Sequence, residues 1–85
     1  MERNILIEKI VGFCFQYQIL DDTSITENEL KTIVEKRLEE AHFLESLINA
    51  IILRTKKTND IDIELVKELL LELEKIRLEV EYKAR

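Results

Sequence analysis

Proline is absent from this 85-residue chain, and glycine occurs once. Tight hairpin turns, strand bulges and phosphate-binding loops depend on these two residue types, because they adopt backbone conformations that other residues avoid. Their scarcity, beside many residues of high helix propensity, predicts long helices and excludes sites built on glycine-rich loops. A chain of this length has room for one hydrophobic core. We therefore expect a single helical domain spanning residues 1–85.

Cysteine is as scarce as glycine. Cys14 is the only one, so no internal disulfide can form, and we expect a reducing, cytoplasmic compartment. Cys14 lies between Phe13 and Phe15 in an apolar stretch, where a thiol normally packs in the core and is unreactive. No Ser-His-Asp or Cys-His arrangement can be read from the sequence, and we expect a protein that is not an enzyme and carries no cofactor.

Long apolar runs and an excess of positive charge are also missing. The longest uninterrupted apolar run, residues 50–53, is far too short to cross a bilayer. The polar residues Glu2, Arg3 and Asn4 at the start predict that no signal peptide opens the chain. The net charge of −5 disfavours nucleic acid and anionic membranes, which are bound by concentrated Lys and Arg. We expect neither among the partners.

The first predicted helix spans about residues 2–19. Its apolar residues recur at the spacing of one helical face: Leu6, Ile10, Phe13, Cys14 and Tyr17. Residues 13–19 also alternate apolar and polar side chains with a period of two, as a strand would. Because a lone strand would leave its backbone groups without partners, we predict a helix.

The second predicted helix spans about residues 27–56. Thr26 as the N-cap, with Glu29 three residues later, makes a capping box, and Ser24 with Glu27 offers a competing start two residues earlier. No breaker interrupts the helix after that point, so it would be roughly 45 Å long. The sequence leaves open whether it is straight or bends near Ala41.

The third predicted helix spans about residues 62–83 and begins after Asp60 or Asp62 as its cap. It carries two apolar rows. One is Val66, Leu69, Leu73, Ile76 and Val80, at the alternating spacings of a coiled-coil seam, and the other is Leu71, Leu78 and Tyr82. This helix has more apolar surface than one neighbour can cover.

These elements predict an all-α three-helix bundle. A monomer would leave about six to eight large apolar residues in water, which soluble monomers rarely tolerate in one patch. We therefore expect a homo-oligomer, most simply a dimer that forms a larger helical bundle, or a different protein partner. The predicted function is that of a small acidic non-enzymatic interaction module, an adaptor, inhibitor or antitoxin-type regulator. Its predicted interaction surface is Phe43, Leu47, Leu71, Leu78 and Tyr82.

His42 is the only histidine, and two glutamates, Glu39 and Glu45, lie three residues to either side. The simplest interpretation is a polar outer face of the second helix. In the alternative, Glu39-x-x-His42 presents a carboxylate and an imidazole on one face of a helix, as metal-binding helical bundles do. This four-residue motif resembles that of the miniature ferritin-like proteins that build an iron site across a dimer interface. The resemblance implies a metal-binding dimer, and we keep it as the alternative function.

Overall fold

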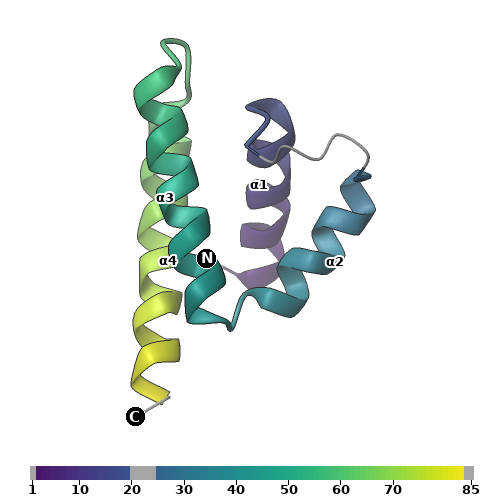
Figure 1. Ribbon diagram of the computed structural model, residues 1–85, viewed down its shortest axis with the longest axis vertical. Helices are drawn as coiled ribbons and strands as arrows, with labels where there is room; N and C mark the ends of the chain where they lie inside the picture. The colour runs from purple at the N-terminus through teal and green to yellow at the C-terminus, as the bar shows by residue number, and fades with distance from the viewer. Residues whose placement is uncertain (1, 20–24, 84–85) are drawn as a thin grey trace.

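The computed structural model describes residues 2–19 and 25–83, which form four helices and no strand. They are α1 (Arg3–Gln16), α2 (Glu27–Arg37), α3 (Ala41–Lys57) and α4 (Ile63–Lys83). α3 and α4 form an antiparallel hairpin along the longest axis, and α1 lies between this hairpin and α2 (Figure 1). The predicted all-α class is confirmed. Within the described ranges, no helix combines the length and hydrophobicity that a bilayer span requires.

The prediction of three helices was wrong, because the expected helix 27–56 is divided into α2 and α3. α2 ends at Arg37, and the backbone N–H of Glu40 donates to the Arg37 carbonyl oxygen at 3.0 Å. Glu40 is extended, with φ −95° and ψ 114°, and serves as the N-cap of α3. The chain therefore changes direction between residues 38 and 40 without any glycine or proline.

The phase of the buried side chains explains this break. A helix turns about 100° per residue, so in an unbroken helix the two groups of buried residues would point about 100° apart. The break allows both groups to enter one core. They are Leu30, Val34 and Leu38 before the break, and Leu44, Leu47 and Ile51 after it.

Dividing this helix also changes what covers α1. Beyond its first apolar face, α1 carries a second apolar row of Ile7, Val11 and Phe15. α2 packs against α1, and Ile7 and Val11 are each only 3% exposed. Phe15, the third member of that row, remains 44% exposed. The row on α1 is therefore mostly core rather than surplus surface.

Two of the predicted helix starts are formed by side-chain caps. The Thr26 hydroxyl oxygen accepts a hydrogen bond from the backbone N–H of Glu29 at 3.2 Å. Thr26 is thus the N-cap of α2, which begins at Glu27. The competing cap Ser24 lies outside the described residues. At the start of α4, the Asp62 carboxylate accepts from the backbone N–H of Leu65 at 3.1 Å. Asp62 is thus the cap in place of the alternative Asp60.

Two residues after α1, the chain has a left-handed residue that is not glycine. Gln18 has φ 50°, and the backbone N–H of Ile19 donates to the Cys14 carbonyl at 3.1 Å, which closes the last turn of the helix. The Gln18 carbonyl accepts from the Arg54 guanidinium at 2.8 Å. This bond ties the end of α1 to α3.

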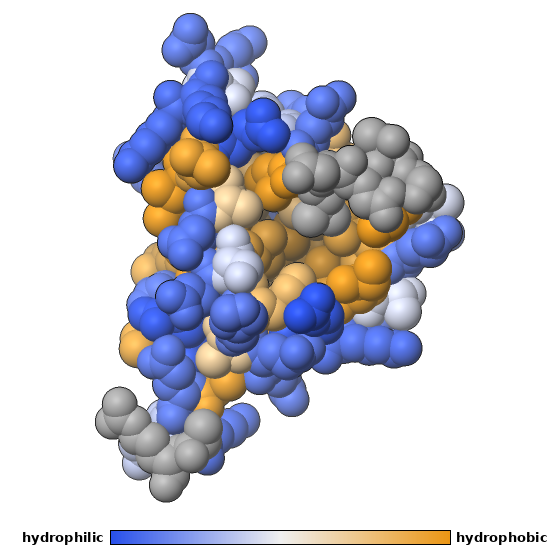
Figure 2. All heavy atoms as spheres, viewed as in Figure 1, coloured by the Kyte–Doolittle hydropathy of each residue, from blue (hydrophilic) through white to orange (hydrophobic). Residues whose placement is uncertain are grey.

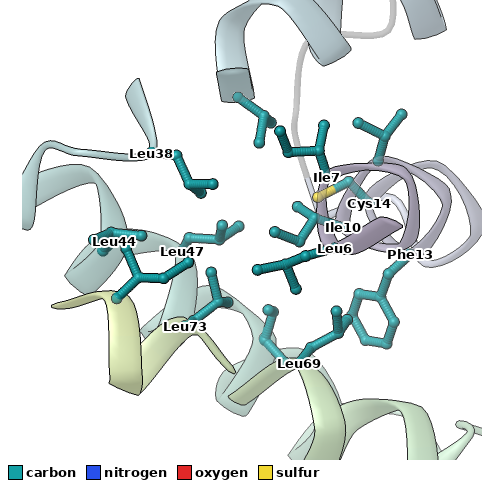
Figure 3. Close-up of a cluster of buried hydrophobic side chains, with 14 of the residues drawn as sticks. Leu6, Ile7, Ile10, Phe13, Cys14, Leu38, Leu44, Leu47, Leu69 and Leu73 are labelled. Carbon is teal, nitrogen blue, oxygen red and sulfur yellow. The ribbon is translucent and has the colours of Figure 1, made fainter. Parts of the chain in front are cut away.

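One hydrophobic core joins all four helices (Figure 3). Side chains of α1 lie between the α3–α4 hairpin on one side and α2 on the other. The most deeply buried large residues, each less than 2% exposed, are Phe13, Leu6, Ile10, Leu38, Leu44, Ile51, Leu69, Leu73 and Val34. No charged or polar side chain is buried among the described residues, so the core is entirely apolar.

The break between α2 and α3 predicts an unusual tolerance for proline. Ala41 is the first residue of α3, where proline costs no hydrogen bond, and the extended Glu40 before it suits a following proline. Ala41→Pro should lower the free energy of unfolding by less than about 1 kcal/mol, whereas Ala50→Pro inside α3 should cost about 3 kcal/mol or more. Urea denaturation followed by circular dichroism measures both. Equal losses would mean that α2 and α3 form one continuous helix.

Candidate interaction surface

The outer side of α4 carries an apolar row that nothing in the described chain covers. The core side of this helix is formed by Val66, Leu69, Leu73 and Ile76, each at most 7% exposed. Leu71, Leu78 and Tyr82 lie about 170° away from that side, because each residue advances about 100° around the axis. Their exposed fractions are 58%, 56% and 82%. We call these three residues the outer row.

Apolar exposure is concentrated on the α3–α4 hairpin. Of the eight large hydrophobic residues that are exposed in the described chain, six belong to α3 or α4. The three outside the outer row are Ile52 and Leu53 near the end of α3 and Ile63 at the start of α4. Figure 2 shows hydrophobic residues reaching the surface along the edge formed by this hairpin, separated by hydrophilic ones. The surplus apolar surface expected from the sequence therefore lies mainly on one pair of helices.

The other two residues of the predicted surface lie elsewhere. Leu47 is 7% exposed and belongs to the core. Phe43 is half-buried, packs against the core, and lies under the Arg37 guanidinium, whose carbon is 4.9 Å from the ring centre. Both positions follow from the break, which fixes the rotation of α3 independently of α2. The candidate surface is therefore the outer row, without Phe43 and Leu47.

A fixed group of charges borders the outer row on one side. The Arg77 guanidinium donates two hydrogen bonds to the Glu74 carboxylate and one, at 3.0 Å, to Glu81. The hydrogen bond from Arg77 lowers the pKa of Glu74 below its usual range, and the same bond raises the pKa of Arg77. One guanidinium thus serves two carboxylates, so this cluster has one net negative charge near the end of α4.

Two lysines complete the border of the outer row. Lys75 lies between Leu71 and Leu78 along the helix, and its ammonium group is 3.6 Å from a Glu72 carboxylate oxygen. Lys67 is exposed one turn before Leu71, on the same side of the row as Glu74 and Glu81. On the side that carries Glu74 and Glu81, the border therefore has a positive charge at one end and a net negative charge at the other.

Glu39 and His42 do not form the expected pair on one helix. Glu39 lies in the break, where its carboxylate accepts from Arg3 at 3.4 Å, whereas His42 is an exposed residue of α3. Among the described residues, no group of three or more His, Cys, Asp and Glu side chains could hold a metal ion. The helical geometry on which the metal-binding alternative relied is therefore absent.

Cys14 is a buried part of the core, only 4% exposed. Burial removes water from around the thiol, disfavours the thiolate and raises the pKa of Cys14 to about 11. Because nucleophilic attack requires the thiolate, the residue is unreactive packing near neutral pH.

Comparison with known protein families, curated proteins and solved structures returned no match.

Burial predicts how Cys14 responds to reagents and to pH. In the native protein at pH 8, an aromatic disulfide reagent should label Cys14 far more slowly than in denaturant. An exposed thiol introduced by Ser46→Cys, in a Cys14→Ala background, should react at once and provides the control. Since the folded pKa lies above the ordinary value of 9.0, the stabilisation from the neutral thiol is complete below pH 9. This contribution to the free energy of unfolding should decline as pH rises from about 9 to 11. Rapid labelling of native Cys14 at pH 8 would contradict its burial.

Proposed function

We propose that this chain is a small, acidic, non-enzymatic protein-interaction module of the cytoplasm, and that the outer row of α4 is its binding surface. An adaptor, an inhibitor and an antitoxin-type regulator all work in this way, by occupying a surface of another polypeptide. The exposure of Leu71, Leu78 and Tyr82 on one side of a single helix carries the proposal.

The energetics of exposure support a binding role. Burying a leucine side chain stabilises a protein by roughly 1.5–3 kcal/mol. Leu71 and Leu78 are more than half exposed, so most of this stabilisation is absent in the isolated chain. Tyr82 adds a large aromatic surface with a polar end, a combination enriched at protein interfaces. Contact with another polypeptide would recover this free energy.

The rigidity of α4 supports it as well. Its other side is anchored in the core by Leu69 and Leu73, both 0% exposed. The outer row is thus held in a fixed helical conformation before any partner arrives, and little conformational entropy is lost when one binds. Anchors at i, i+7 and i+11 correspond to the way an amphipathic helix occupies a groove or completes a bundle.

Site-specific photo-cross-linking in the native cell tests this proposal. A photoreactive phenylalanine analogue at Leu78 should form a cross-link to another polypeptide, whereas the same analogue at the exposed Thr32 of α2 should not. Mass spectrometry identifies the captured chain. Binding of that chain, purified, should then fall at least about tenfold when Leu71 and Leu78 are both replaced by Glu. Equal capture from both positions, or binding that the double variant leaves unchanged, would contradict the proposed surface.

A further inference from the structure

We propose that the occupant of the outer row is a second copy of this chain, whose α4 lies antiparallel to the first across a two-fold axis. The inference rests on the proposed binding surface and identifies the partner. It follows from the spacing of the two leucines and from the charges at the two ends of the row.

The leucine spacing is compatible with antiparallel self-pairing. Leu71 and Leu78 are two helical turns apart on the same side of α4, a rise of about 10.5 Å. With the two-fold axis midway between them, Leu71 of each copy packs against Leu78 of the other. One symmetric contact then covers the exposed leucines of both copies.

The charges at the ends of the row are complementary in this arrangement. Lys67 precedes Leu71 by four residues, and Glu81 follows Leu78 by three, on the same side of the row. The antiparallel copy therefore brings Lys67 of one chain to Glu81 of the other, beside the ring of Tyr82. Glu81 has only one oxygen engaged by Arg77, so it can accept from an incoming ammonium group. The lysine would also neutralise the net charge of the cluster around Arg77.

On the other side of the row, each contact between like charges includes at least one group that is paired within its own copy. Lys75 approaches Lys75 of the second copy near the two-fold axis, and each ammonium group is 3.6 Å from its own Glu72 carboxylate. Toward the ends of the row, Glu79 of one copy comes near Glu68 of the other, whose carboxylate is bound by Lys9. The attraction between the copies therefore comes from Lys67 and Glu81.

The size of the contact predicts a dimer that dissociates on dilution. Stable interfaces bury about 800 Å² on each partner, and pairing through one helix face falls at the low end of that range.

Charge reversal tests the proposed pairing. Sedimentation velocity over a dilution series should show wild-type protein passing from dimer to monomer. Lys67→Glu and Glu81→Lys should each weaken association about tenfold or more, because each places like charges at both ends of the contact. Lys36→Glu on α2 makes the same charge change away from the hairpin and should leave association unchanged.

Mixing the two variants separates an interface effect from a folding defect. In a mixed antiparallel dimer, the glutamate introduced by Lys67→Glu would face the lysine introduced by Glu81→Lys, and the other end would keep the original Lys67 and Glu81. An equimolar mixture of the two variant chains should therefore associate to within about threefold of wild type. The same recovery is expected for a single chain that carries both substitutions.

Three results would overturn the antiparallel dimer. They are a wild-type monomer at every concentration, association that single charge reversals leave unchanged, and a mixture as weak as its components. If the chain is monomeric and the probe at Leu78 captures a different protein, the second copy is wrong but the binding surface stands. If the chain is monomeric and Leu78 captures nothing, the binding surface fails as well.

Discussion

The change of direction between α2 and α3 is the constraint on which the rest of the structure depends. Leu38 at this break is completely buried, and Glu40, two residues later, is the N-cap of a new helix. The chain can then place α2 against α1 and α3 against α4. An unbroken helix could have served only one of these neighbours with its buried side chains, because its two apolar groups would have diverged around the axis.

The division of the helix also determines which apolar surfaces remain free. α2 covers Ile7 and Val11 on α1, so the inner helix has neighbours on both sides. α4 has core contacts on one side only, since α3 and α1 already occupy the side that carries Leu69 and Leu73. The exposed leucines of the outer row are consequently left outside, on a helix that the core holds firmly. The exposed row is thus a result of how the other three helices pack.

Features that depend on local spacing could be predicted from the sequence, and those that depend on tertiary competition could not. The caps at Thr26 and Asp62 follow from side chains a few residues from the groups they bind. The two rows of α4 follow from its own periodicity, so the exposure of Tyr82 was predictable. The break was not, because residues 38–40 include no glycine or proline. The sequence signal that could have revealed the break is the spacing of six residues between Leu38 and Leu44. In one continuous helix this spacing would put the two leucines on different faces, because each residue advances about 100° around the axis.

The same distinction explains which residues of the predicted surface are exposed. Phe43 and Leu47 belong to α3, whose rotation is set by the break, and both pack against the core. Leu71 and Leu78 were predicted from the two apolar rows of their own helix, and both are exposed. Predictions made within one helix were therefore more secure than predictions carried across a junction.

Binding at the outer row would also affect the stability of the fold. α4 contributes Leu69 and Leu73 to the core and Leu71 and Leu78 to the outer surface, so both functions rely on the same helical backbone. A partner that recognises this helix binds the folded chain and not the unfolded one. Occupancy of the row therefore raises the free energy of unfolding in proportion to the logarithm of partner concentration. If the partner is another copy, the stability of this small domain depends on its own concentration.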